Sequence, residues 1–246
     1  MSALLELDAV TRRFGGLLAV DSVSFAVEEG SIVGIVGPNG AGKTTLFSLI
    51  GGSVRPTAGR IHFRGQDVSG WRPERAAREG VCRTFQVMRP FPSMTVLENV
   101  MVGALLRRYG VAAARERAEE CIELVGLGHK ADDTAAGLST GQRKRLEMAR
   151  AMATEPKLLL LDEVTGGVDQ RSIPGLVELI SKLRASGLTL LVIEHNMRVI
   201  TALADRLVAL HLGRVITEGP PAEVVRHEEV ERAYLGGALI TEIDDA

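Results

Sequence analysis

The chain has 246 residues, enough for one large domain or two small lobes, and its hydrophobic content of 46% supplies a core. Lys and Arg (29) nearly balance Asp and Glu (31), and only 4% of the residues are aromatic, which argues against a general nucleic-acid binder. Cys82 and Cys121 form no CxxC pair, so we expect neither a zinc site nor a disulfide framework, and a reducing compartment fits.

The sequence predicts neither a secretory signal nor a membrane helix. Its first ten residues, MSALLELDAV, lack the positively charged start of a signal peptide and already include Glu6 and Asp8. No uncharged apolar run approaches the roughly 18 residues that a membrane helix needs. We therefore expect a soluble intracellular protein, with no nucleic-acid partner, that reaches a membrane through another subunit.

Strand-like and helix-like patterns alternate along the first part of the chain. The segments LLELDAV and LLAVDSVSFAV predict half-buried strands of a β region. SIVGIV predicts a buried strand, followed by a helix from about Lys43, and GRIHFRGQDV predicts a short strand and a turn. From Pro73 to about Glu155 the pattern is mostly helical.

The strand pattern returns in the last third, over KLLLLD, LTLLVIE and RLVALHLGRVI, with helices predicted at 172–185 and 196–204. This order predicts an α/β fold, with a parallel sheet covered by helices and the central helical stretch inserted as a subdomain. We expect one domain over 1–246, with core segments 1–72 and 157–218, a mainly α-helical part at 73–156 and a C-terminal helical appendage at 219–246.

A phosphate-binding loop is the firmest chemical signal. GPNGAGKTT, residues 37–45, satisfies GxxxxGK(S/T) through Gly37, Gly42, Lys43 and Thr44. A buried strand precedes it and a helix follows, so backbone N–H groups and the helix dipole face one point. Lys43 is then expected to hold the β and γ phosphates, and the Thr44 hydroxyl to bind Mg²⁺. The alternative is a glycine-rich turn that happens to contain a lysine.

Two carboxylates follow the apolar strand in KLLLLDE, residues 157–163. A magnesium nucleotide needs one acid near the metal and, for hydrolysis, a base that orients water. Asp162 suits the first role and Glu163 the second. Without the phosphate loop, the preferred interpretation would be a buried strand with polar residues at its exit.

Three further residues each have a functional and an ordinary interpretation. His195, after the strand in LLVIEHN, either contacts a γ-phosphate or attacking water, or is a plain loop residue. Gln86 in CRTFQ is, on its own, a solvated residue at a strand end. Phe14 in VTRRFGG either stacks on an adenine or packs in the β region.

A second anion site is predicted at LSTGQRK, residues 138–144. This short polar loop leads into a cationic helix, QRKRLEMARAMA. The first turn of a helix offers unpaired N–H groups, and Ser139 and Gly141 leave room for an anion to reach them. A chain that binds one nucleotide would therefore carry two phosphate-binding segments, residues 37–45 and 138–144.

In this order and spacing, GPNGAGKTT, Gln86, LSTGQRKRLEMARA, LLLLDE, GGVD and His195 resemble the ATP-binding cassette (ABC) ATPases across nearly the whole chain. The resemblance implies a P-loop NTPase fold, with a RecA-like core, an antiparallel β region and an inserted α-helical subdomain that carries the signature loop. It also implies ATP hydrolysis with ATP and Mg²⁺ as cofactors.

The resemblance also assigns roles to individual residues. Phe14 is the adenine-stacking aromatic, and the triphosphate is wrapped by Gly37, Pro38, Asn39, Gly40, Ala41, Gly42, Lys43, Thr44 and Thr45. Mg²⁺ is bound through Thr44, Gln86 and Asp162, while Glu163 is the catalytic base and His195 the γ-phosphate switch. In a head-to-tail dimer, the signature residues Ser139, Gly141 and Gln142 serve the partner's γ-phosphate, and Asp169 communicates across the interface.

Two positions depart from the family pattern. Thr140 replaces the second-position glycine of LSGGQ, a site that varies among relatives. Val164 stands where proline commonly follows the catalytic glutamate, and VTGGVDQ is an unusual version of the loop that ends in Asp169. These changes bear on how Glu163 is presented, and so on the rate of hydrolysis.

The whole assembly looks like the importer ATPases for branched-chain amino acids, whose relatives serve urea uptake and lipopolysaccharide export. The resemblance implies a second, identical or related cassette, integral membrane permease subunits, an extracytoplasmic solute-binding protein, and a peripheral place on the cytoplasmic face of the inner membrane. The segment with Arg89, Phe91, Pro92 and Met94 either receives a helix of the permease or is an ordinary surface loop.

Two other classes remain open. A soluble cassette acting on nucleic acid or the ribosome usually fuses two cassettes or carries long coiled coils, and neither is found in this sequence. Membership of a small-molecule kinase or GTPase family would account for the phosphate loop but would leave LSTGQRK without a function.

Overall fold

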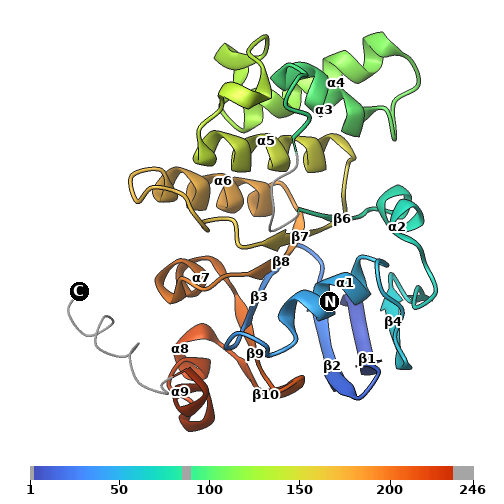
Figure 1. The fold of residues 1–246 in the computed structure, drawn as a ribbon, viewed down its shortest axis with the longest axis vertical. Helices are drawn as coiled ribbons and strands as arrows, with labels where there is room; N and C mark the ends of the chain where they lie inside the picture. The colour runs from blue at the N-terminus through green and yellow to red at the C-terminus, as the bar shows by residue number, and fades with distance from the viewer. Residues whose placement is uncertain (1–2, 85–89, 235–246) are drawn as a thin grey trace. The chain divides into compact units, whose positions relative to one another are not determined.

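The computed structural model describes residues 3–84 and 90–234, which form two compact units (Figure 1). The first unit comprises Met1–Pro73 and Thr189–Ala246, and the second comprises Glu74–Leu188. Two distant stretches of chain thus build the first unit. Among the helices of the described ranges, none is both long and apolar enough to cross a bilayer.

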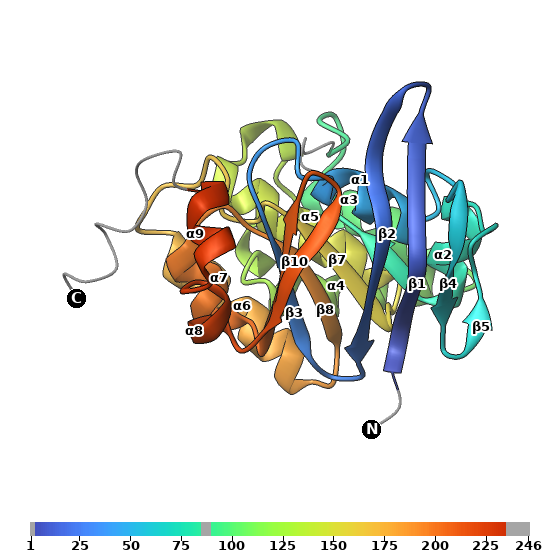
Figure 2. The ribbon, with the colours of Figure 1, turned by 90° about the horizontal axis from the view of Figure 1, so that it is seen from below.

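The first unit contains an antiparallel sheet in the order β2-β1-β4-β5 (Figure 2). Its strands are β1 (Ala3–Phe14), β2 (Leu17–Glu28), β4 (Ala58–Phe63) and β5 (Gln66–Asp67). Apolar residues such as Val20, Val23 and Val27 are buried, while polar residues of the same strand are more exposed, as expected of a sheet with one covered face. The predicted N-terminal β region is confirmed.

Parallel strands form the second sheet of this unit. β3 (Ile32–Val36) pairs in parallel with β8 (Thr189–Ile193) on one side and with β9 (Arg206–His211) on the other. Every residue of β3 and β8 is buried, which explains their unbroken apolar sequences. Around these strands lie α1 (Lys43–Ile50), α7 (Met197–Leu203), α8 (Pro221–Val224) and α9 (Glu228–Tyr234).

The segment RLVALHLGRVI, predicted as one strand, is a hairpin. β9 is followed by β10 (Arg214–Gly219), which returns antiparallel to it. Leu212 and Gly213, between the strands, both have positive φ angles, 46° and 82°. Such angles turn the chain sharply, and the apolar pattern on both sides of Leu212 hid the turn.

The second unit holds a parallel strand pair and most of the helices (Figure 1). β6 (Val81–Arg83) pairs with β7 (Leu158–Asp162), and β6 was not predicted because only three residues interrupt the helical pattern. The helices are α2 (Pro73–Glu79), which starts at the unit boundary, α3 (Val96–Ala104), α4 (Val111–Leu124), α5 (Thr140–Ala153) and α6 (Ile173–Ala185), with 3₁₀ turns at Gly128–Lys130 and Ala135–Gly137.

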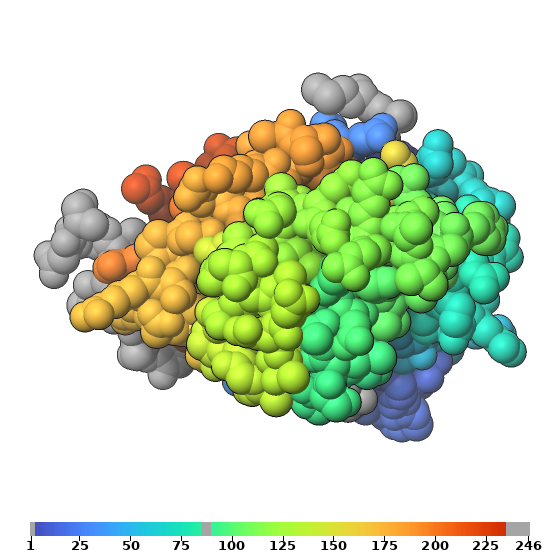
Figure 3. All heavy atoms as spheres, turned by 90° about the horizontal axis from the view of Figure 1, so that it is seen from above, coloured from blue at the N-terminus to red at the C-terminus, as the bar shows by residue number. Residues whose placement is uncertain are grey.

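Helices α3, α4 and α5 pack on one another around small and branched side chains, including the fully buried Val100, Ala118 and Leu146. Small residues such as Ala118 let neighbouring helices approach closely, and branched ones fill the space between them. The green and yellow-green surface in Figure 3 belongs to this helical group. The alternation of strands and helices confirms the predicted α/β class.

Candidate nucleotide-binding site

The phosphate loop connects the buried strand β3 to helix α1, and two of its glycines are required by the fold. A Cβ atom at Gly37 would lie 2.2 Å from the Leu210 carbonyl oxygen, and one at Gly42 would lie 2.5 Å from the Ala19 carbonyl oxygen. Gly42 also has φ 101° at the N-cap position of α1. A side chain at either position would push the loop away from its supporting strands.

The start of α1 presents groups that suit a phosphate. No side chain in the described ranges caps the helix, so the N–H groups of its first turn are available to an anion. Lys43 is buried, and its Nζ donates to the carbonyl oxygens of Gly37 at 2.6 Å and of Pro38 at 3.0 Å. Thr44 is exposed at the helix start, and Thr45 is half-buried.

Two other predicted residues lie in the same unit. Phe14 ends β1 with 42% of its surface exposed, and the Arg12 guanidinium lies 4.4 Å from the ring centroid. Phe14 is therefore not a core residue, and its ring can stack on planar cations. His195 is exposed, between the end of β8 and the helix α7, whose first turn Asn196 caps through a bond from the Val199 N–H.

In the second unit, Asp162 ends β7 and is buried. Its Oδ2 accepts a hydrogen bond of 2.8 Å from Nη2 of Arg83. Its Oδ1 is also buried and has no hydrogen-bond partner among the described residues. A carboxylate oxygen with spare acceptor capacity is the donor that Mg²⁺ prefers, so Asp162 fits a metal-side role.

Glu163 follows with an unusual backbone. Its φ is 50°, in the left-handed region that non-glycine residues seldom occupy. Its carbonyl oxygen accepts a hydrogen bond of 2.7 Å from Nζ of Lys144, a buried residue of α5. Val164, in the place of the family's proline, is buried at 3% exposure. Strained conformations of this kind cluster at functional sites, where surrounding contacts hold them in place.

The signature residues form the first turn of α5. This helix begins at Thr140, two residues before the predicted start, because Ser139 and Gln142 form a capping box. Ser139 Oγ accepts from the Gln142 N–H at 3.3 Å, and Gln142 Oε1 accepts from the Ser139 N–H at 2.9 Å. At Gly141, an added Cβ would lie at an ordinary 3.5 Å from Ser172 Cβ, so packing within the chain does not require glycine there.

Asp169 is exposed in the loop before α6. Ser172 donates to it twice, from its N–H at 3.1 Å and from its hydroxyl at 2.8 Å. The hydroxyl bond is the main reason that the pKa of Asp169 lies below its usual value. Gln86 and Arg89 lie outside the described residues.

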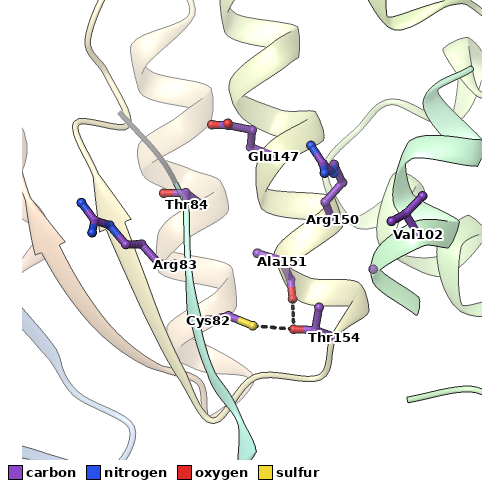
Figure 4. Close-up of a pocket in the computed structure, with 9 residues that line it drawn as sticks. Cys82, Arg83, Thr84, Val102, Glu147, Arg150, Ala151 and Thr154 are labelled. Atoms are coloured by element: carbon purple, nitrogen blue, oxygen red, sulfur yellow. Dashed lines mark hydrogen bonds between the residues drawn. The ribbon is translucent and has the colours of Figure 1, made fainter. Parts of the chain in front are cut away.

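A cavity of about 320 Å³ opens beside the signature helix (Figure 4). It lies between β6, α3 and α5, and its lining consists of Cys82, Arg83, Thr84, Val102, Gly103, Glu147, Arg150, Ala151 and Thr154. The Arg150 guanidinium lies 4.9 Å from the ring centroid of Phe91, which is 41% exposed. Asn99, fully buried, accepts from the Phe91 N–H and donates to its carbonyl oxygen, which fixes this loop.

Three residues of these sites were missed by the sequence analysis: Arg83, Lys144 and Tyr234. Arg83 and Lys144 carried a detectable signal, because each is a charged residue within a buried segment, and such residues need a partner. Tyr234 carried none, since its contact with Gly37 joins residues far apart in the chain.

Comparison with known proteins identifies relatives over nearly the whole chain. A family model described as ABC transporter matches residues 20–166, and one described as branched-chain amino acid ATP-binding cassette transporter matches residues 214–239. The high-affinity branched-chain amino acid transport ATP-binding proteins BraF of Pseudomonas aeruginosa and LivG of Escherichia coli are each 39% identical, over 96% of this chain and 98% of theirs.

Other relatives extend the comparison. The lipopolysaccharide export system ATP-binding protein LptB of Haemophilus influenzae is 36% identical over 95% of this chain and 98% of its own. Among solved structures, a nucleotide-free ATP-binding cassette from an ABC transporter superposes with TM-score 0.88, 30% identity and coverage of 96% and 100%. The dimeric post-hydrolysis state of the cassette MJ0796, bound to ADP and Pi, superposes with TM-score 0.79, 28% identity and coverage of 88% and 98%.

Proposed function

Because the chain belongs to the ABC transporter family and is an ATP-hydrolysing subunit of such a transporter, we propose that it powers the import of branched-chain amino acids. The observation that carries the choice of solute is the 39% identity to BraF and LivG over 96% of the chain. LptB, at 36%, makes lipopolysaccharide export the second candidate. A urea transporter remains a further alternative within the same family.

ATP is held by the loop of residues 37–45, with the N–H groups of α1 and the Lys43 ammonium around its phosphates. The uncapped first turn of α1 and the two sterically required glycines support this role. We assign Mg²⁺ to the Thr44 hydroxyl, Asp162 and Gln86; when bound, the ion neutralises charge that develops on the phosphates. The open Oδ1 of Asp162 supports the assignment.

Glu163 accepts a proton from the attacking water, and His195 contacts the γ-phosphate. The left-handed backbone of Glu163 and its bond from Lys144 support a dedicated role, because a relaxed loop residue needs neither. Phe14 stacks on the adenine. Its exposed ring at the end of β1 is consistent with this assignment.

The working unit is a head-to-tail dimer with a second copy or a related cassette. Ser139, Gly141 and Gln142 then approach the γ-phosphate held by the other chain, and Asp169 contacts that chain. Gly141 supports this arrangement, since its own chain leaves room for a Cβ and the absence of a side chain serves an outside contact. The MJ0796 cassette is dimeric in its ADP-bound and Pi-bound state.

The permease contacts the second unit at the cavity beside α5. Val102 (41% exposed) and Arg150 line the cavity, Phe91 (41%) lies against Arg150, and Leu105 (52%) is exposed at the end of α3, so apolar surface and a charge lie together here. We propose that a cytoplasmic helix of the permease enters here, which places the chain on the cytoplasmic face of the inner membrane with a solute-binding protein outside. Residues 73–156 then form the signature subdomain, between core segments 1–72 and 157–218, and a segment from 219 forms the appendage; of the predicted range 219–246, residues 235–246 lie outside the described part of the chain.

The solute is tested by uptake into vesicles that contain the chain with its co-purified permease and binding protein. We expect ATP-dependent uptake of labelled leucine, with isoleucine and valine as competitors, and loss of uptake with Glu163→Gln. Vesicles that take up urea but not leucine, or that only move lipopolysaccharide, would contradict the proposal.

The docking surface is tested separately. Phe91→Asp should greatly reduce recovery of the permease with the chain, because a charge is costly in an apolar contact. Leu124→Asp is the matched control, since Leu124 is similarly exposed (44%) on α4 but does not line the cavity, whereas Phe91 lies against the lining residue Arg150. Equal recovery with both variants would rule out Phe91 as part of the contact.

A further inference from the structure

The C-terminal helix of the described chain contacts the phosphate loop directly. Tyr234, the last residue of α9, accepts a hydrogen bond of 2.5 Å at its hydroxyl oxygen from the Gly37 N–H. Gly37 is the first residue of the phosphate loop. The segment matched by the branched-chain transporter model, 214–239, therefore reaches the phosphate loop through Tyr234, the last residue of its described part.

Gly37 is held from three sides. Its backbone lies so close to β9 that a Cβ would approach the Leu210 carbonyl oxygen to 2.2 Å. Its N–H donates to Tyr234, and its carbonyl oxygen accepts from Lys43 Nζ at 2.6 Å. Tyr234 and the phosphate-binding lysine therefore bond to the two polar backbone groups of one residue.

Tyr234 is positioned by the packing of α8 and α9 on the β9–β10 hairpin, which in turn pairs with the strand that leads into the loop. Helix α8 contacts β9 and β10, and α9 contacts β10 (Figure 2). Val224 and Val230 anchor the two helices with 2% and 3% exposure. β9 pairs with β3, the strand that leads into the loop, so the hydroxyl is aimed by a continuous packed framework.

The hydroxyl is also kept protonated and uncharged. Tyr234 is largely buried, and this burial is the main reason that its pKa lies above the usual value. The side chain therefore stays neutral throughout the physiological range. A neutral phenol has acceptor capacity for one amide and does not repel phosphate.

We propose that Tyr234 is a positioning residue for nucleotide binding, which fixes Gly37 and so presets the phosphate loop before ATP arrives. Without the hydroxyl, the Gly37 N–H loses its partner, and the loop must become ordered when the nucleotide binds. The ordering cost then appears as weaker affinity. The inference rests on the proposed role of residues 37–45 in holding the triphosphate.

The test compares Tyr234→Phe with Arg232→Ala in the full chain. Phe keeps the ring and removes only the hydroxyl, whereas Arg232 is an exposed residue of the same helix that pairs with Glu228. Binding of a fluorescent ATP analogue, mant-ATP, and steady-state hydrolysis are measured with Mg²⁺. We expect Tyr234→Phe to raise the Kd and the KM about two- to tenfold, the effect of one hydrogen bond, with a much smaller change in kcat. Arg232→Ala should match the unaltered chain.

A third variant separates positioning from loss of structure. Val230→Ala removes a buried anchor of α9 and should lower the midpoint of thermal unfolding. Tyr234→Phe should weaken the affinity for mant-ATP and should lower that midpoint less than Val230→Ala does. If Tyr234→Phe binds mant-ATP as tightly as the unaltered chain, or more tightly, the positioning role is wrong. Lys43→Ala tests the phosphate-loop role independently, because retained mant-ATP binding there would count against residues 37–45 and not against Tyr234.

Discussion

Arg83 and Asp162 form a buried ion pair where the neighbouring strands β6 and β7 end. Nη2 lies 2.8 Å from Oδ2, and the two side chains are 11% and 0% exposed. Parallel pairing sets Arg83 opposite Leu160, two residues before Asp162. Arg83 also lines the cavity proposed to receive the permease, so one side chain touches both that cavity and the proposed metal-side acid.

Removing Arg83 should therefore destabilise the fold strongly. Arg83→Met leaves the Asp162 carboxylate buried and unpaired, and we expect a loss of about 3 kcal/mol in the free energy of unfolding. Arg83→Met with Asp162→Asn should recover part of the loss, because no charge is left uncompensated. Urea titration of the four chains of this cycle measures the coupling.

A surface pair provides the control for this cycle. Arg115 pairs with Glu119 on α4 with both side chains more than half exposed. Arg115→Met should cost under about 1 kcal/mol. Additive effects of the Arg83 and Asp162 substitutions would show that the buried pair is not energetically coupled.

Glu163→Gln should slow ATP hydrolysis by roughly 10² to 10⁴, the contribution of a positioned general base. ATP binding should persist, because the amide keeps the size of the carboxylate. The matched control is Glu178→Gln, an exposed glutamate of α6 paired with Lys182. Single-turnover hydrolysis and mant-ATP binding measure the two effects. Unchanged turnover in Glu163→Gln would remove the residue from this role.

Lys144→Met tests whether the signature helix supports the catalytic loop. The substitution keeps an unbranched side chain that is shorter by the terminal nitrogen, and so removes the bond from Nζ to the Glu163 carbonyl oxygen. We expect kcat to fall about 10- to 100-fold, because a bond from a charged donor is lost, while the KM for ATP changes little. A higher KM for ATP with an unchanged kcat would instead place Lys144 in nucleotide binding.

The parts of the site that are contiguous in sequence were predictable. Strand, loop and helix follow one another around GPNGAGKTT, and KLLLLDE combines a buried strand with its carboxylates, so local pattern and spacing sufficed. The fold class followed from the alternation of strands and helices. The hairpin at Leu212 and the three-residue strand β6 were missed because apolar or helical patterns continue through them.

The contacts that tie these motifs to the rest of the chain were not predictable. Arg83 meets Asp162 because β6 and β7 pair in parallel, and Lys144 meets Glu163 because α5 packs close to the end of β7. Such partners depend on strand order and helix packing, which periodicity does not encode. The capping box of Ser139 and Gln142 could have been found, since serine followed three residues later by glutamine is its sequence signature.

The composite site is tested by mixing two inactive chains. Ser139→Asp keeps an N-cap side chain for α5 but places a negative charge where the partner's γ-phosphate is proposed to lie. Lys43→Ala removes the phosphate-binding ammonium. Each variant alone should hydrolyse little ATP, whereas a mixed dimer has one intact combination of loop and signature. Partial recovery of ATPase activity on mixing is expected.

The N-cap of α3 supplies the control for this experiment. Thr95 and Glu98 form the same kind of capping box as Ser139 and Gln142, at the start of a helix to which no nucleotide contact is assigned. Thr95→Asp should leave hydrolysis unchanged, which would assign the effect of Ser139→Asp to its position. If heterodimers form and hydrolysis stays at the level of the separate variants, the shared site is contradicted.

Cys121 should make the stability of the fold depend on alkaline pH. Burial in α4 raises its pKa from 9.0 to about 11. Well below pH 9 the thiol is protonated in both states. Between pH 9 and about 11 it ionises in the unfolded chain alone, so the unfolded state binds fewer protons and the free energy of unfolding falls as pH rises. Cys121→Ala removes this contribution.

Urea midpoints at pH 8, 9 and 10 measure the effect as a difference between the two chains, in which the titration of other groups largely cancels. The unaltered chain should lose more stability than Cys121→Ala over this range. The same burial should protect the thiol from iodoacetamide at pH 8 until the chain unfolds, because the thiolate is the reactive form. Parallel pH profiles together with rapid alkylation of the folded chain would show that Cys121 is accessible to water, which its 1% exposure argues against.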